Sequence, residues 1–220
     1  MLKVFIAPNY NGLPPHVDNG GIRRVVEAQI QHLPKFGVEV VYNVQEADVI
    51  NTHGTTLVEY GNTPIVNTSH GMYWSRQPWG DGFMEVNEQL VEAMHAAVAW
   101  TAPSDWVNKA IRRGGYWYPE TVLHGINGAD FLPSKTHGKY ILWNKLRSDF
   151  VSDPGDMIIA AERNHQYEFV STIGSANRGY SNPNNLRVTG IMPHSEMKKL
   201  VSETGLYLST VRETGGIGVM

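Results

Sequence analysis

The sequence contains no cysteine, which excludes a disulfide framework, a thiolate nucleophile and a cysteine metal site. It also has no excess of basic residues, since 18 lysines and arginines stand against 21 acidic residues and give a net charge of −3. Nucleic acid is therefore not an expected partner. No segment approaches 18 uncharged apolar residues, and the N-terminus has no signal-peptide pattern. We expect a cytoplasmic globular protein.

The N-terminal 42 residues show the pattern of a strand, a helix and a second strand. Residues 2–7 and 38–42 are apolar runs that predict buried strands. Between them, apolar residues from Ile22 to Leu33 recur at three- to four-residue spacing, which predicts an amphipathic helix. A strand that starts at residue 2 and feeds such a unit is typical of an α/β fold.

The same alternation continues to the end of the chain and is interrupted once, by a polar stretch at 134–138. We therefore predict an α/β protein with two Rossmann-like domains, 1–133 and 139–220, joined by a linker at 134–138. Further strands are predicted at 47–52, 63–69, 97–100, 121–123, 139–143, 167–173, 186–188 and 206–209, and helices at 86–97, 105–113, 154–163 and 195–202.

The predicted strands at 47–52 and 63–69 each run into a His-Gly dipeptide, His53-Gly54 and His70-Gly71. Neighbouring parallel strands end at one edge of a sheet, where α/β proteins bind ligands, so the pair predicts a site there. Taken singly, each histidine reads more readily as a loop residue without chemistry. A zinc site is the alternative, but no third ligand stands at a recognisable spacing, and we predict no metal.

Two glycines, Gly20 and Gly21, open the first predicted helix, directly after strand one and its loop. A flexible turn is one interpretation of this pair. The other is a ligand site, because a glycine pair lets the backbone approach a ligand at the carboxyl end of a strand. The position in the chain favours the second interpretation.

The last eleven residues, 210–220, predict an anion site. They follow the strand at 206–209 and pass through a glycine-rich turn into the first turn of a helix. Uncovered amides at such a helix start bind phosphate, while Glu213 suits hydroxyl donors. Because Met220 falls within that first turn, we expect the second domain to be incomplete and to self-associate through an exposed apolar patch.

Two further segments carry weaker signals. Residues 72–83 are rich in aromatic residues and glycine, which predicts either an ordered loop over a pocket or plain surface packing. Lys109, Arg112 and Arg113 cluster on the helix at 105–113, for which Ser104 is the expected N-cap. Most such clusters are solvated faces, and the alternative is peripheral contact with anionic lipid.

Six segments in order resemble retaining sugar-nucleotide glycosyltransferases of the GT-B fold, in the large family that includes bacterial mannosyl- and glucosyltransferases. Gly20-Gly21 with its helix is similar to that family's glycine loop, and residues 213–220 are similar to the opening of its Glu-x7-Glu motif, whose second glutamate would be residue 221. Asn144-Lys145 stands where the family has Gly-Arg, and His124 where it has asparagine. The other similar segments are 47–53, 64–71, 104–106, 125–127 and 188–193.

The resemblance implies transfer of a sugar, with retention at the anomeric carbon, from a nucleotide-sugar donor to a saccharide, lipid-linked or other small acceptor. It implies that Lys145 and Arg147 neutralise the diphosphate, together with the amides of Thr214, Gly215 and Gly216. It further implies that Glu213 holds sugar hydroxyls, that His70 approaches the transferred sugar, and that Gly20 and Gly21 lie close to donor phosphate and acceptor. No metal or other cofactor is required in this mechanism.

Three alternatives compete with this interpretation. The chain could be a sugar-nucleotide-binding relative without turnover, which the unusual Asn144-Lys145 pair supports. It could be a structural α/β fragment that a second polypeptide completes. A nicotinamide-dependent oxidoreductase is disfavoured, because no Gly-x-Gly-x-x-Gly follows strand one.

Overall fold

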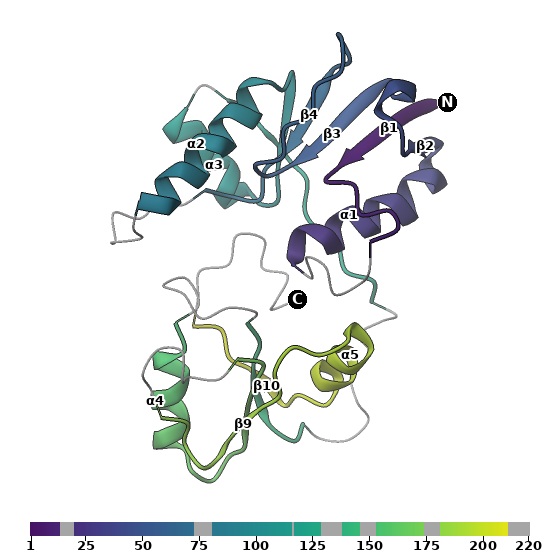
Figure 1. Ribbon diagram of the computed structural model, residues 1–220. Coiled ribbons are helices and arrows are strands. Elements are labelled where there is room, and N and C mark those ends of the chain that lie inside the picture. Colours follow the sequence, from purple (N-terminus) through teal and green to yellow (C-terminus); the bar gives the residue numbers. More distant parts are fainter. Residues whose placement is uncertain are drawn as a thin grey trace. The chain divides into compact units, whose positions relative to one another are not determined.

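The computed structural model describes residues 1–13, 20–72, 81–115, 117–128, 138–145, 153–173 and 181–210, with the side chains of 81–83 left out. The chain divides into two compact units, Met1–His124 and Gly125–Met220. Each is an α/β unit (Figure 1). Apart from Gly138, the predicted linker at 134–138 lies outside the described residues and stays a prediction.

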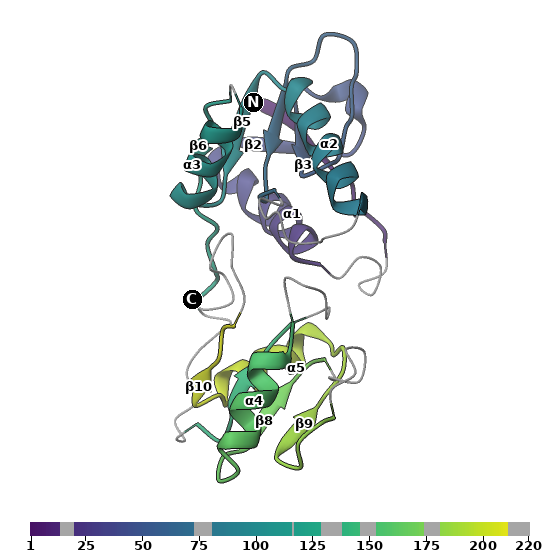
Figure 2. The same cartoon turned by 90° about the vertical axis from the view of Figure 1, so that its left-hand side faces the viewer.

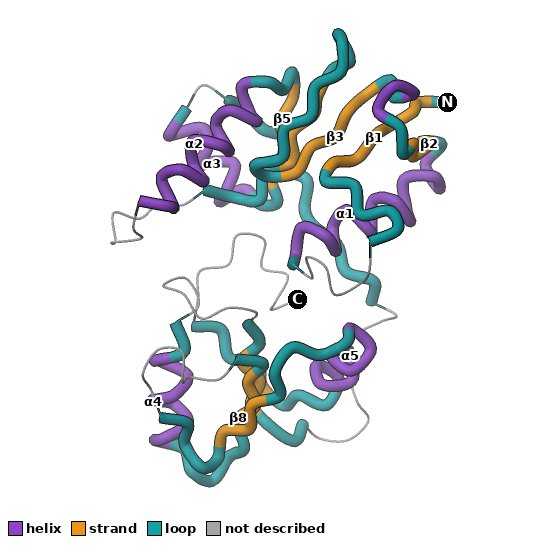
Figure 3. Tube along the Cα trace, in the orientation of Figure 1, coloured by secondary structure: helices purple, strands orange, loops and turns teal. Residues whose placement is uncertain are grey.

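The first unit contains one parallel sheet of six strands in the order β2-β1-β3-β4-β5-β6 (Figures 1 and 3). Strand order reverses at β1, which pairs with β2 on one side and with β3 on the other. Such a reversal is the topological switch point at which open α/β sheets bind ligands. The strands are β1 Leu2–Ala7, β2 Val38–Val41, β3 Val49–His53, β4 Ile65–Thr68, β5 Ala99–Ala102 and β6 Glu120–Thr121.

Helices cover both faces of this sheet (Figure 2). On one face, Val26 of α1 (Gly21–His32) packs against Val4 and Ile6 of β1. On the other face, Met94 of α2 (Asp81–His95) packs with α3 (Asp105–Gly114). Side chains alternate along a strand, so β3 presents Val49, Asn51 and His53 to the α1 face and Ile50 and Thr52 to the other.

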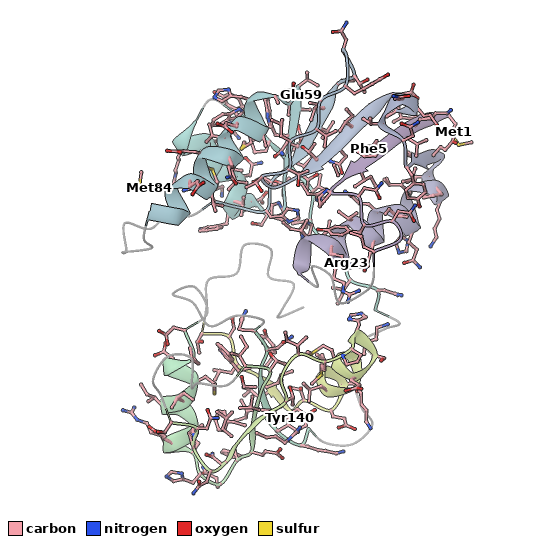
Figure 4. All side chains as sticks on the ribbon, in the orientation of Figure 1. Met1, Phe5, Arg23, Glu59, Met84 and Tyr140 are labelled. Atoms are coloured by element: carbon pink, nitrogen blue, oxygen red, sulfur yellow. The ribbon has the colours of Figure 1, made fainter. Side chains whose placement is uncertain are left out.

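The second unit has a parallel sheet of four strands in the order β10-β7-β8-β9, again covered on both faces. Trp143 and Phe169 pack against α4, whereas Leu142 and Val170 pack against Leu200 of α5. Tyr140, labelled in Figure 4, packs with Leu200 of α5, and its hydroxyl donates to the carbonyl of Leu200 at 2.7 Å. The elements are β7 Ile141–Trp143, α4 Gly155–Arg163, β8 Phe169–Ser171, β9 Leu186–Val188, α5 His194–Ser202 and β10 Leu206–Tyr207.

The predicted fold class is confirmed: both units are α/β with parallel, helix-covered sheets. The Ser104 cap is also confirmed, since its hydroxyl accepts the amide of Val107 at 3.2 Å. The predicted start of α2 at residue 86 was wrong, because the helix begins at Asp81 and takes in three residues of the expected aromatic loop. Residues 73–80 of that loop lie outside the described residues.

Among the described residues, no helix combines the length and the apolar character needed to cross a membrane.

Candidate active site

Strand β3, which lies beside the switch point, and its neighbour β4 both change from apolar to polar residues halfway along their length. β3 begins with Val49-Ile50 and ends with Asn51-Thr52-His53, and β4 begins with Ile65-Val66 and ends with Asn67-Thr68. Interior strands of a parallel sheet are normally apolar throughout. The polar halves lie side by side, because Thr52 pairs with Asn67 and His53 with Thr68. Buried polar groups therefore collect at the carboxyl edge of the sheet.

On the α2 face, Asn67 holds the turn that follows β3. Its amide donates to the hydroxyl of Thr52 at 3.0 Å and to the carbonyl of Gly54 at 3.2 Å. Gly54 has φ +59°, a left-handed conformation that favours glycine. A Cβ at Gly54 would lie 3.5 Å from Ile22, so this turn reaches the start of α1.

On the α1 face, His53 lies at the centre of a hydrogen-bonded cluster and is 1% exposed. Its Nε2 lies 2.9 Å from Oε1 of Gln29 on α1 and 3.1 Å from Oδ1 of Asn51. Its Nδ1 lies 3.0 Å from Nε2 of His70. Both ring nitrogens are thus engaged by the protein.

His70 joins this cluster from the end of β4 and remains half-buried. Its ring stacks on His53, with ring centroids 5.3 Å apart and planes inclined by 27°. The ring of His124 also lies near His70, with ring centroids 5.4 Å apart and planes inclined by 47°. The structure therefore brings the two predicted histidines together and adds a third, which we call collectively the histidine cluster.

Burial keeps the histidine cluster uncharged near neutral pH. Desolvation, together with the neighbouring His70 and His124, lowers the pKa of His53 from 6.5 to about 3. Desolvation and His124 lower the pKa of His70 to about 4, and desolvation lowers the pKa of His124. A charged ring here would lose its hydration without gaining an anionic partner. The cluster therefore offers neutral hydrogen-bonding groups.

The glycine pair lies at the start of α1 on the same side of the fold. Gly20 is the N-cap and Gly21 the first helical residue, and a Cβ at Gly21 would meet nothing within 4 Å. Close by, Arg23 is 4% exposed and lies at the N-terminal end of α1 in Figure 4. It pairs with Glu27 at 2.8 Å and donates to the carbonyl of Leu13 at 3.1 Å. Arg23 thus anchors the chain that follows β1.

In the second unit, Lys145 follows β7 at the carboxyl edge of the sheet. The hydroxyl of Thr172, which follows β8, accepts the amide of Lys145 at 3.1 Å. The same hydroxyl lies 2.6 Å from the carbonyl oxygen of Lys145 and 3.1 Å from Oδ1 of Asn144. The backbone at the predicted diphosphate-binding lysine is therefore fixed by a neighbouring strand.

The other predicted residues of this anion site lie outside the described residues. They are Arg147, Glu213, Thr214, Gly215 and Gly216.

Sequence reasoning missed three residues that the structure brings into these sites: Asn51, His124 and Thr172. A signal existed for Asn51, because an Asn-Thr pair interrupts two otherwise apolar strands, at 51–52 and 67–68. A signal existed for His124 too, because the same His-Gly dipeptide follows the strand predicted at 121–123. Thr172 carries no such local signal, and its importance arises only from a strand neighbour distant in sequence.

The basic cluster on α3 is exposed. Lys109, Arg112 and Arg113 all face solvent, and the guanidinium of Arg112 lies 5.0 Å from the ring centroid of Tyr118. This arrangement fits a solvated face and a lipid contact equally, so both interpretations of the cluster stay open.

Metal ligands do not gather in the part of the chain that the structure describes: no group of three or more His, Asp or Glu side chains there could hold an ion. Two open hollows of about 590 and 430 Å³ lie elsewhere, one lined by 162, 165 and 182–185 and one along α2. Neither includes a predicted site residue. The histidine cluster is the stronger candidate site, because polar side chains from β3, α1 and the segment after β4 converge there.

No family model and no curated protein matches this sequence. Among solved structures, the chain is similar to the crystal structure of TarM, with a TM-score of 0.56 and 9% sequence identity over 76% of this chain and 37% of TarM. That likeness shows a shared fold, and the chain spans little more than a third of the length of TarM.

Two further solved structures are similar at lower TM-scores. UDP-GlcNAc 2-epimerase from Methanocaldococcus jannaschii has a TM-score of 0.43 and 11% identity, over 94% of this chain and 77% of the epimerase. The glycosyltransferase SnogD from Streptomyces nogalater has a TM-score of 0.32 and 12% identity, over 88% of this chain and 72% of SnogD.

Proposed function

We propose that this chain belongs to a glycosyltransferase that moves a sugar from a nucleotide-sugar donor to a saccharide, lipid-linked or other small acceptor, with retention at the anomeric carbon. The observation that carries the proposal is the pair His53 and His70, hydrogen-bonded at 3.0 Å beside the switch point of a Rossmann-like sheet. Neutral imidazoles at such an edge suit hydroxyl groups rather than phosphate.

The chemistry of sugar transfer asks for two kinds of group. One kind binds and orients the hydroxyls of the sugar, and the other stabilises the negative charge that develops on the departing diphosphate. In our proposal the first unit supplies His70 for the sugar, while Gly20 and Gly21 allow close approach of backbone to donor and acceptor.

The second unit supplies the groups for the diphosphate. Lys145 carries the positive charge, and Thr172 fixes its backbone. Arg147 and the amides of Thr214, Gly215 and Gly216 complete this set in the proposal, and Glu213 accepts hydrogen bonds from the sugar. Lipid contact through α3 and self-association of the chain stay predictions.

Release of nucleoside diphosphate tests the proposal. The protein is incubated with UDP-glucose or GDP-mannose, with and without saccharide acceptors, and free UDP or GDP is measured. Release with formation of a glycoside is the expected result, and proton NMR of the product reports the anomeric configuration. Binding without release would support the inactive relative, an inverted product would overturn retention alone, and neither binding nor release would contradict the whole proposal.

A further inference from the structure

The side-chain amide of Asn51 has one orientation only. Its Nδ2 lies 3.1 Å from the backbone carbonyl oxygen of Val66 and 2.9 Å from the hydroxyl of Thr68. A carbonyl oxygen can only accept a hydrogen bond, so the NH₂ group must face it. The oxygen Oδ1 is therefore the atom that lies 3.1 Å from Nε2 of His53.

This orientation determines which nitrogen of His53 carries the proton. An oxygen acceptor at 3.1 Å requires a donor, so Nε2 is protonated, and Oε1 of Gln29 at 2.9 Å offers that same N–H a second acceptor. A neutral imidazole with a proton on Nε2 has a lone pair on Nδ1. Nδ1 of His53 therefore accepts.

The hydrogen bond between His53 and His70 then determines which nitrogen of His70 carries the proton. Nε2 of His70 lies 3.0 Å from Nδ1 of His53, so it must donate and must carry the proton of His70. The remaining nitrogen of His70, Nδ1, then holds a lone pair. The titratable groups that contact His70 among the described residues are His53 and His124, and burial lowers the pKa of both.

We propose that Asn51 and His53 are positioning residues that hold His70 as its Nε2–H tautomer, so that His70 offers Nδ1 as an acceptor to a hydroxyl group of the ligand. The tautomer assignment stands on the hydrogen-bond geometry and on the burial that keeps both rings uncharged. The identity of the donor as a sugar hydroxyl rests on the proposed function. A lone pair repels phosphate oxygens, so this edge would recognise the sugar and not the diphosphate of the donor.

Nitrogen-15 NMR of the histidine side chains tests the tautomer directly, because protonated and unprotonated ring nitrogens give separate signals. The full chain labelled with ¹⁵N-histidine is measured at pH 7, and the two rings are assigned by their loss in His53→Phe and His70→Phe. The expected result is an Nε2–H form for both His53 and His70. An Nδ1–H form or a cation at His70 would overturn the proposal.

Variants test whether the tautomer of His70 depends on Asn51 and His53. In Asn51→Leu the fixed acceptor is lost, and in His53→Phe the acceptor for His70 is lost, so the signals of His70 should shift towards a mixture of tautomers. Thr68→Val is the matched control, since the carbonyl of Val66 still orients Asn51, and His70 should remain Nε2–H. If Asn51→Leu or His53→Phe does not fold, His70→Phe still assigns the ring of His70, and the wild-type spectrum then decides its tautomer. Unchanged ¹⁵N signals of His70 in a folded His53→Phe variant would contradict this dependence.

Binding tests the ligand class separately. Affinities for UDP-glucose, GDP-mannose, UDP and GDP are measured for wild type, His70→Phe and the exposed control His165→Phe. One lost hydrogen bond predicts a roughly threefold to tenfold weaker binding of whichever nucleotide sugar binds wild type, with no change for UDP or GDP.

The outcomes separate the two proposals. Equal losses for nucleotide sugar and nucleoside diphosphate would overturn the sugar-hydroxyl role. If wild type binds neither nucleotide sugar, the proposed function and that role fall together, whereas the tautomer spectrum still decides the positions of the protons.

Discussion

The hydroxyl of Thr172 accepts the amide of Lys145 at 3.1 Å and lies 2.6 Å from the carbonyl oxygen of the same residue. Thr172 is 6% exposed and follows β8, the strand that pairs with β7. The backbone N–H and the backbone C=O of Lys145 thus both bond to a single buried side chain from 27 positions away. This contact fixes the backbone of the predicted diphosphate-binding lysine.

Thr172→Val should therefore destabilise the second unit, because it keeps the shape of the side chain but leaves buried backbone groups without partners. The expected loss is about 1–3 kcal/mol in the free energy of unfolding, measured by urea denaturation. Thr189→Val is the control, since the hydroxyl of Thr189 makes longer hydrogen bonds, of 3.4 Å to the carbonyl of Ser171 and 3.2 Å to the carbonyl of Gly190. Equal effects of the two substitutions would show that the hydroxyl of Thr172 has no special role.

Lys145→Ala should lower the rate of sugar transfer by about 10²–10³, since removal of one group aimed at developing charge typically costs that much. The measurement is steady-state release of nucleoside diphosphate in the active protein. Lys139→Ala is the matched control, because that exposed lysine pairs with the half-buried Glu203 at 3.5 Å. Activity of the Lys145 variant within threefold of wild type would remove this lysine from the mechanism.

The stability of the protein should fall as the pH drops below about 6.5. His53 and His70 have pKa values of about 3 and about 4 in the folded chain, against 6.5 ordinarily. The unfolded chain therefore binds protons that the folded chain rejects, and each histidine contributes a slope approaching about 1.4 kcal/mol per pH unit between its two pKa values. Above pH 7 this contribution is constant.

Urea denaturation at pH 7.5, 6.0 and 5.0 measures this dependence. His70→Asn should flatten the decline in stability below pH 6.5, whereas His165→Asn, at an exposed position of the second unit, should leave it unchanged. The same pH slope in wild type and His70→Asn would show that burial of His70 does not penalise its charged form.

The alternation of strands and helices was readable from the sequence because each element carries its own local pattern. β1 is apolar apart from Lys3, and α1 places Val26 and its neighbours on one face. The start of α2 was missed because Asp81-Gly82-Phe83 has the composition of a loop, and local preference is a weak guide to where a helix begins.

The histidine cluster was only partly readable. The repeated His-Gly dipeptide indicated His53 and His70, but the hydrogen bonds that set their tautomers depend on Asn51 and on the carbonyl of Val66 across the strand pair. His124 carries the same dipeptide, but its position beside His70 depends on the edge strand β6, whose two residues pair with β5. Contacts of this kind follow from register, which a single sequence does not display.

A close approach of two backbones in the second unit leads to the last prediction. Gly138 precedes β7 and Gly205 precedes β10, and a Cβ added at Gly138 would lie 1.8 Å from Cα of Gly205. No side-chain rearrangement relieves that clash, since both partners are main-chain atoms. The hydrogen bond from the amide of Gly205 to the carbonyl of Tyr140, at 2.9 Å, ties the two segments together at this point.

Gly138→Ala should therefore push β10 away from β7 and lower the free energy of unfolding by about 1–3 kcal/mol or more. Gly205→Ala should cost less, because its Cβ would lie 3.1 Å from Cα of Gly138, and Gly128→Ala should cost least, because its Cβ would meet nothing within 4 Å. Urea denaturation of the three variants checks this order, and hydrogen exchange at the amide of Gly205 reports the strand contact itself. A Gly138 variant as stable as the Gly128 variant would mean that the two strands separate without cost.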